Sequence, residues 1–123
     1  MEVETAGTLD PPDLPVDQWN VSLKLAHSGV PEDRRIRPQA IRAFIARESW
    51  FKFVVAQPGE VDEVIELQKQ FALPRERILL MPEGVRTEEL LERSKWVWDA
   101  CRIHGFRFSP RLQILIWGAK RGR

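Results

Sequence analysis

Short apolar runs alternate with longer segments of helical periodicity along this sequence, and this alternation restricts its fold more than any other feature. Residues 50–56 read WFKFVVA and residues 77–84 read RILLMPEG, two compact runs typical of buried strands. Between them, residues 61–71 place apolar side chains at helical spacing, and Pro74 ends that helix. Residues 87–104 repeat the helical pattern after the second run.

The remaining segments extend the same alternation toward both ends of the chain. VETAGT near the N-terminus predicts a short strand, and the Pro-rich LDPPDLP after it predicts a loop. Thr87 is expected to cap the helix that follows it, and Gly105 to end that helix. Three further elements are predicted, a strand over 19–25, a helix over 36–48 and a last strand over 112–117.

The resulting order is strand, strand, helix, strand, helix, strand, helix, strand. Such a run of βαβ units requires parallel strands with right-handed crossovers, so the expected fold class is α/β. We expect residues 1–123 to form a single domain. Five strands are too few for a closed eight-stranded barrel, which takes on the order of 250 residues, so the sequence predicts an open sheet or an incomplete barrel.

The charge balance argues against strongly charged partners. Nineteen Lys and Arg side chains oppose eighteen Asp and Glu, which gives a formal net charge of +1. We therefore expect neither nucleic acid nor an anionic membrane as a partner. No apolar run approaches the length of a membrane span, and the first fifteen residues are unlike a signal peptide, so a cytoplasmic location is expected.

Cys101 is the single cysteine of the sequence. It falls on the predicted apolar stripe Leu90, Leu91, Ser94, Val97, Trp98, Cys101, which indicates a buried helical thiol without a catalytic role. One thiol excludes an internal disulfide, and it also excludes an iron-sulfur site built from this chain's cysteines alone.

In α/β folds, ligand groups gather where parallel strands end. A carboxylate, a hydroxyl and an ammonium at successive strand ends are suited to recognition of a ribose, an amino acid headgroup or a carboxylated heterocycle, rather than to bond breaking. No catalytic residue and no metal ligand is predicted. The candidates at the predicted strand ends are Glu4, Thr5, Gly7, Ser22, Lys24, His27, Ser28, Gln57, Met81, Glu83, Trp117, Lys120 and Arg121.

Each candidate also has a structural interpretation. Ser22 and Lys24 are favoured as a pair because strand side chains two residues apart share a face. For Glu4 a solvent-exposed strand-end acid is favoured over a ligand contact, and for His27 a solvated or capping histidine is favoured over a general base. Glu83, between Pro82 and Gly84, either forms a turn or contacts a ligand. Met81 is expected in the core, and the basic residues Lys120, Arg121 and Arg123 as a solvated tail.

Five motifs in order resemble the C-terminal half of the 7-carboxy-7-deazaguanine synthases, a radical S-adenosylmethionine family. They are VETAGT, WNVSLKLAHSG, FKFVV, LLMPEG and GFRFSPRLQILIWGAKRG. The resemblance implies a partial, incomplete TIM-type barrel of parallel βα units, the C-terminal half of a radical SAM fold. It also implies a lyase reaction of queuosine biosynthesis that converts 6-carboxy-5,6,7,8-tetrahydropterin to 7-carboxy-7-deazaguanine with loss of ammonia.

The resemblance also assigns roles to individual residues. In the family, an N-terminal Cys-x-x-x-Cys-x-x-Cys segment holds the 4Fe-4S cluster, and this sequence contains neither that segment nor the family's magnesium ligands. S-adenosyl-L-methionine is the implied cofactor, contacted by Glu4, Thr5, Ser22 and Lys24. The small-molecule pterin is the implied substrate, contacted by Trp117, Lys120 and Arg121. Leu23 stands where the family usually has proline between the serine and the lysine.

Two functional hypotheses follow. In the first, the chain is half of a split or truncated synthase that becomes active when a cysteine-bearing N-terminal polypeptide completes the barrel. An unpaired strand at VETAGT would then favour that partner or a homodimer. In the second, the chain is a non-enzymatic remnant that serves as a binding or interaction module.

Overall fold

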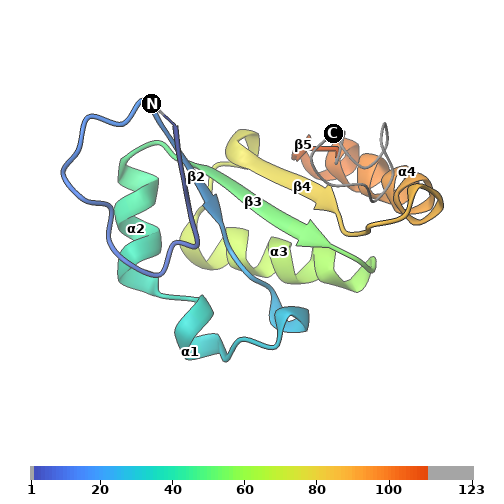
Figure 1. Ribbon diagram of the computed structural model, residues 1–123, viewed down its shortest axis with the longest axis horizontal. Helices are drawn as coiled ribbons and strands as arrows, with labels where there is room; N and C mark the ends of the chain where they lie inside the picture. The colour runs from blue at the N-terminus through green and yellow to red at the C-terminus, as the bar shows by residue number, and fades with distance from the viewer. Residues whose placement is uncertain (1, 111–123) are drawn as a thin grey trace.

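The computed structural model describes residues 2–110, which form an α/β fold. Figure 1 shows the central strands side by side, with α3 running along them. The strands are β1 (Glu2–Thr5), β2 (Gln18–Ser22), β3 (Trp50–Val55), β4 (Ile78–Pro82) and β5 (Arg107–Phe108). The helices are α1 (Glu32–Arg35), α2 (Pro38–Ala46), α3 (Gly59–Phe71) and α4 (Thr87–His104), with short 3-10 turns at Ala26–Ser28 and Arg75–Arg77.

The five strands form one sheet in the order β1-β2-β3-β4-β5, and every neighbouring pair is parallel. This confirms the α/β class and the βαβ prediction. The TIM-type barrel is not confirmed, because the described residues form a single five-stranded sheet. In this sequential order the carboxyl ends of β2, β3 and β4 meet at one edge of the sheet, where the loops that follow them come together.

The two faces of the sheet differ in burial. Phe51, Phe53 and Val55 on β3 are fully buried against the helices, while the alternate residues Trp50 and Lys52 are only half-buried. The same alternation holds on β2 and β4. The helices therefore cover one face, as right-handed crossovers between sequential strands require.

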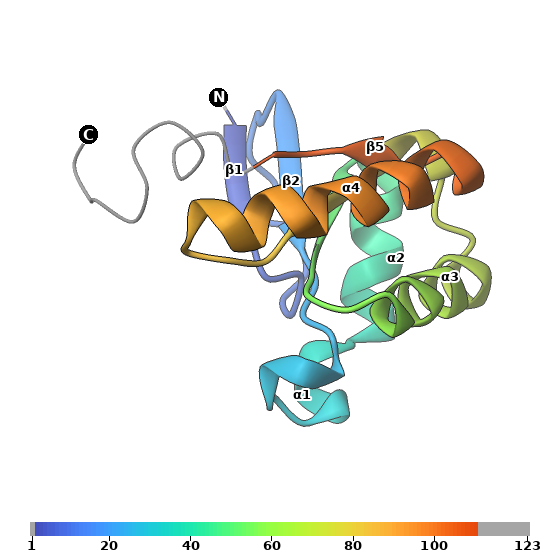
Figure 2. The ribbon, with the colours of Figure 1, turned by 90° about the vertical axis from the view of Figure 1, so that its right-hand side faces the viewer.

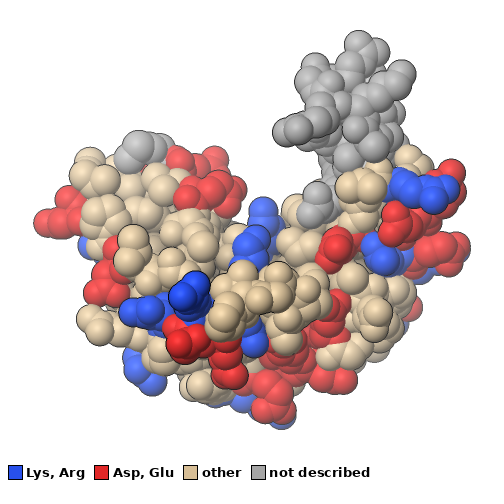
Figure 3. Space-filling view, turned by 60° about the horizontal axis from the view of Figure 1, so that its bottom comes forward, with Lys and Arg blue, Asp and Glu red and all other residues tan. Residues whose placement is uncertain are grey.

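Figure 3 presents a surface on which acidic and basic side chains are interspersed.

Several element boundaries differ from the sequence prediction. The predicted helix over 36–48 corresponds to α2, which begins only at Pro38. The short helix α1 lies before it, in a segment without a predicted element, and Ile36 and Arg37 are extended between the two helices. Pro38 begins α2 because proline fits the first helical turn and disfavours helical geometry in the residue before it. Thr87 does not cap α4 but is its first residue, since Arg86 holds the capping position without a side-chain bond. Gly105 ends α4 in the left-handed conformation, as predicted.

The helix α4 lies against β4 and β5 (Figure 2). Leu90, Val97 and Cys101 are buried as predicted, but the prediction is wrong for Leu91 and Trp98, whose exposed fractions are 53% and 58%. These two side chains lie outside the helical stripe that faces the sheet. Trp98 instead packs its ring edge-on against Phe108, with ring centroids 5.7 Å apart.

The strand β5 precedes the predicted last strand, and no sequence pattern predicted it. The predicted strand over 112–117 lies outside the described residues. Among the described helices, none is long and apolar enough to cross a membrane.

Candidate functional site

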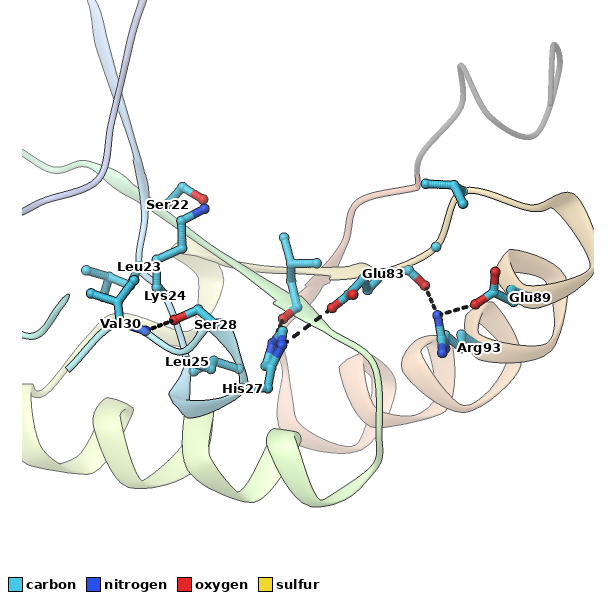
Figure 4. A pocket seen from close by; sticks show the side chains of 13 residues that line it. Ser22, Leu23, Lys24, Leu25, His27, Ser28, Val30, Glu83, Glu89 and Arg93 are labelled. Atoms are coloured by element: carbon cyan, nitrogen blue, oxygen red, sulfur yellow. Dashed lines mark hydrogen bonds and ion pairs between the residues drawn. The ribbon is translucent and has the colours of Figure 1, made fainter. Parts of the chain in front are cut away.

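A cavity of about 570 Å³ opens at the carboxyl ends of β2, β3 and β4 (Figure 4). This is the edge at which α/β folds place their ligands. The polar residues that line the cavity are Ser22, Lys24, His27, Ser28, Glu83, Glu89 and Arg93, and its apolar lining includes Val30, Val54 and Val85. The structure thus brings together five of the predicted site residues, from Ser22 to Glu83.

The loop after β2 is fastened to the neighbouring elements by His27. Its Nε2 lies 3.1 Å from the carbonyl oxygen of Val54 and 3.2 Å from Oε2 of Glu60, and its Nδ1 lies 3.5 Å from Oε2 of Glu83. The backbone N–H of Ala26 donates to the Glu63 carboxylate at 3.0 Å. The loop is therefore attached to β3, to α3 and to the end of β4.

The turn that carries Glu83 is held from both sides. The Glu83 N–H donates to the carbonyl oxygen of Val55 at 2.8 Å, and the guanidinium of Arg93 donates to the Glu83 carbonyl oxygen at 2.5 Å. Arg93 also pairs with Glu89 one helical turn away, at 3.1 Å. Gly84 follows with φ 156°, and a Cβ there would meet Leu90 at 3.1 Å. The carboxylate of Glu83 thus projects from an ordered backbone.

Ser22 and Lys24 lie on the β2 side of the cavity (Figure 4). The strand β2 ends at Ser22, yet the alternation continues, because Leu23 and Leu25 are buried while Ser22 and Lys24 are not. Among the described residues, neither polar side chain has a hydrogen bond or ion pair. An ammonium and a hydroxyl without partners at a strand end are suited to bind a carboxylate or another acceptor group of a ligand.

Other predicted residues do not line this cavity. Glu4 is exposed on β1, and the Thr5 hydroxyl accepts a hydrogen bond from the Gly7 N–H at 3.2 Å, so it serves the turn after β1. Gln57 is exposed in the turn between β3 and α3. Met81 is half-buried on the open face of the sheet, so the expectation that it packs in the core is wrong. Trp117, Lys120 and Arg121 lie outside the described residues.

The described residues do not fit a metal site. Over residues 2–110, no group of three His, Cys, Asp or Glu side chains could hold a metal ion. Cys101 is only 4% exposed, and burial raises the pKa of its thiol to about 11. A metal or cluster ligand must be a thiolate, and burial disfavours that form of Cys101. The prediction of a buried helical thiol is confirmed.

Sequence reasoning missed two residues that organise the site. In the sequence Glu60 stands out only as an acidic residue in the first turn of α3. In the structure its carboxylate accepts hydrogen bonds from the backbone N–H groups of Ala56 and Gln57 and also contacts His27. Arg93 carries no signal beyond its position four residues after Glu89, a spacing typical of helical ion pairs. Its contact with Glu83 depends on how α4 packs, which a local pattern does not encode.

No family model matches this sequence. Individual curated proteins do: the chain is 39% identical to the 7-carboxy-7-deazaguanine synthase of Pyrobaculum aerophilum, over 100% of this chain and 54% of that protein. It is 31% identical to the synthase of Halobacterium salinarum, over 94% of this chain and 53% of that protein. It is 29% identical to the synthase of Rhodopirellula baltica, over 98% of this chain and 51% of that protein. The chain spans about half the length of the curated relatives it matches.

Proposed function

We propose that this chain, a partial homologue of the 7-carboxy-7-deazaguanine synthases, provides the C-terminal half of such an enzyme. The reaction proposed for the whole enzyme converts 6-carboxy-5,6,7,8-tetrahydropterin to 7-carboxy-7-deazaguanine with loss of ammonia, a step of queuosine biosynthesis. The observation that carries the proposal is the 39% identity to the Pyrobaculum synthase over the full length of this chain. The cavity at the carboxyl ends of β2, β3 and β4 supports it independently.

In this proposal Ser22 and Lys24 bind S-adenosyl-L-methionine. Both line the cavity, and neither has a polar partner within residues 2–110. When bound and reduced by a 4Fe-4S cluster, this cofactor supplies a 5'-deoxyadenosyl radical. The Lys24 ammonium would hold a carboxylate by a charge-assisted hydrogen bond, and the Ser22 hydroxyl would donate or accept beside it. Glu4 and Thr5 lie on β1 and would contribute from outside this cavity.

The iron-sulfur cluster does not fit the residues of this chain. Three protein thiolates are needed for such a cluster, and the sequence has one cysteine, which is buried and protonated at neutral pH. We therefore place the cluster ligands on a segment outside this sequence, in the same polypeptide or in a separate one. The magnesium ion of the family is assigned to that segment as well.

The pterin is assigned to the same half of the enzyme by the family resemblance. Lys120 and Arg121 would pair with its carboxylate, and Trp117 would stack on its ring. These three residues lie outside the described part of the chain, so this assignment comes from the sequence alone.

Complementation tests the proposal. The chain is co-expressed with the N-terminal half of the Pyrobaculum synthase, the cluster is reconstituted anaerobically, and 7-carboxy-7-deazaguanine is measured by mass spectrometry. We expect product from the two halves together and a large loss of product when Lys24→Met is introduced, with Lys69→Met on the exposed side of α3 as the matched control. Product from this chain alone would contradict the assignment of the cluster. Absence of product from the assembled halves would count against the proposal and favour the alternative, a binding or interaction module.

A further inference from the structure

We propose that Glu83 binds the nucleoside part of an adenosyl ligand by accepting hydrogen bonds from it, while Lys24 binds the carboxylate of the same ligand. Glu83 is then the second anchor of the cavity. His27 is the positioning residue of Glu83. This inference rests on the proposed function, which supplies the class of ligand. It adds a role for two residues to which the family resemblance assigns none.

The hydrogen-bonding of His27 fixes the direction of its ring. Nε2 faces two acceptors, the carbonyl oxygen of Val54 and Oε2 of Glu60, so this nitrogen must carry a proton. Nδ1 then faces Oε2 of Glu83 at 3.5 Å and donates to it when the ring carries a second proton. Because the ring is attached to β3 and to α3, it presents a constant edge to the Glu83 carboxylate.

Glu83 has the properties of a ligand contact. One carboxylate oxygen faces His27, while the other, Oε1, accepts no hydrogen bond within the described part of the chain. The backbone N–H and carbonyl groups of Glu83 are held by Val55 and Arg93, so the base of its side chain is in place before a ligand arrives. Its side chain is 44% exposed and lines the cavity (Figure 4). A preorganised acceptor of this kind binds N–H or O–H groups without a large ordering cost.

The spacing of the strands indicates which part of the ligand Glu83 meets. Lys24 follows β2 and Glu83 follows β4, with β3 between them, so their backbones start about 10 Å apart. The two side chains enter the cavity from different sides (Figure 4), and no ion pair joins them within residues 2–110, so they are placed to hold different parts of one ligand. Glu83 therefore faces a group remote from the ligand's carboxylate. In an adenosyl compound the remote donors are the ribose hydroxyls and the adenine amine.

The wall between the two anchors is apolar. Val54 lies on β3 between them, and Val30 and Val85 line the cavity from the adjoining loops. Such a surface suits the thioether chain and the rings of an adenosyl compound, which need burial more than hydrogen bonds. The Lys24 ammonium therefore suits the anionic end of such a ligand, and the valine wall suits its apolar middle. The Glu83 carboxylate suits its other end, which is rich in hydrogen-bond donors.

Two ligands used as probes distinguish the contribution of Lys24 to binding from that of Glu83. S-adenosylhomocysteine carries both the amino acid carboxylate and the nucleoside, and 5'-methylthioadenosine carries the nucleoside alone. Binding of each is measured by calorimetry to the wild-type chain and to Glu83→Gln, Lys24→Met and Glu88→Gln, the last changing an exposed carboxylate outside the cavity. We expect Glu83→Gln to weaken both probes about tenfold or more. Lys24→Met should weaken S-adenosylhomocysteine alone, and Glu88→Gln should change neither.

A double-mutant cycle tests the positioning role of His27. His27→Gln keeps an amide near the Val54 and Glu60 acceptors but loses the contact with Glu83. We expect it to weaken both probes about three- to tenfold, and to cause no further loss in the Glu83→Gln background, because it acts through that carboxylate. A purely structural role would give the same loss in both backgrounds. Thermal unfolding of each variant confirms that it is folded.

The outcomes distinguish this inference from the proposed function. If the wild-type chain binds S-adenosylhomocysteine and Glu83→Gln binds both probes as tightly as wild type, Glu83 is no anchor and the inference is overturned, while the cofactor site at Lys24 stands. If the His27→Gln loss persists in full in the Glu83→Gln background, the positioning role is overturned. If the wild-type chain binds neither probe, the cofactor site of the proposed function is wrong and this inference falls with it.

Discussion

At the scale of single residues, Gly7 shows how closely the turn after β1 approaches β2. It adopts φ 71°, and a Cβ at this position would lie 2.6 Å from Cγ1 of Val21. The left-handed conformation and the contact both require glycine here. The VETAGT motif is thus explained in part by packing. The hydroxyl of Thr5 accepts a hydrogen bond from the Gly7 N–H, and the missing side chain of Gly7 leaves room for Val21 of β2.

We predict that Gly7→Ala lowers the free energy of unfolding by about 2–3 kcal/mol, because Val21 is fully buried and has little room to move. Gly29→Ala is the matched control, since Gly29 also has a positive φ, 80°, but a Cβ added there would meet no atom within 4 Å. The control should cost only about 1 kcal/mol in urea-induced unfolding. Equal losses for the two variants would mean that the contact with Val21 does not matter.

The Cys101 thiol gives a prediction on pH. Burial raises its pKa from 9.0 to about 11, so the folded state favours the protonated thiol. This contribution to stability is complete below pH 9 and is lost as the pH rises toward 11, by up to about 3 kcal/mol. Chemical unfolding at pH 8 and pH 10.5 measures the loss, and Cys101→Ala should reduce it. Rapid reaction of the native thiol with a disulfide reagent at pH 8 would show that it is not buried.

Five residues of the cavity could be chosen from the sequence, because each lies at or just after the end of a predicted strand and parallel strands end together. They are Ser22, Lys24, His27, Ser28 and Glu83. Their contacts could not be predicted. The link from His27 to Glu83 joins residues 56 positions apart and depends on the sheet order and the turn geometry, which single-strand patterns do not contain.

At the scale of secondary-structure elements, the start of α3 depends on Glu60. One carboxylate oxygen accepts the backbone amides of Ala56 and Gln57 at 2.6 and 2.8 Å, and the other lies 3.2 Å from His27. These amides belong to the turn between β3 and α3. The single side chain thus joins a helix start, the end of β3 and the wall of the cavity.

We predict that Glu60→Gln lowers the free energy of unfolding by about 1–2 kcal/mol, because a neutral amide is a weaker acceptor for two backbone donors than a carboxylate. Glu66→Gln, an exposed site on the same helix, is the control and should change stability by less than about 0.5 kcal/mol. Urea-induced unfolding followed by circular dichroism measures both. A loss in the control as large as in Glu60→Gln would point to a general charge effect.

Long elements with clear periodicity were predictable, and short ones were not. The helix over 87–104 matches α4, because its apolar stripe and Gly105 define it locally. The four-residue α1 and the two-residue β5 carry too few residues for a periodic signal. The boundary at Pro38 was missed because Ile36, which is buried, fits the helical stripe although it lies outside the helix.

At the scale of the whole molecule, the sheet formed by residues 2–110 has one face packed by helices and one face that none of the described helices covers. All-parallel sheets are usually covered on both faces. The residues on the open face include Asn20, Lys52 and Met81, which are half-buried rather than fully solvated. This asymmetry supports the proposal that the chain is the C-terminal half of a larger enzyme. The alternation of strands and helices predicted the parallel topology, whereas closure into a barrel stays a prediction.

The cavity between β2 and β4 is the proposed site of the adenosyl ligand, and every functional role proposed for Ser22, Lys24 and Glu83 depends on it. The most direct measurement is a titration of the isotopically labelled chain with S-adenosylhomocysteine, followed by backbone amide chemical shifts. The largest shifts are predicted for residues 22–30 and 83–85, with small changes around Trp98 and Phe108, which line a separate cavity on α4 and β5. Shifts centred on Trp98 and Phe108, or no shifts at saturating ligand, would contradict it.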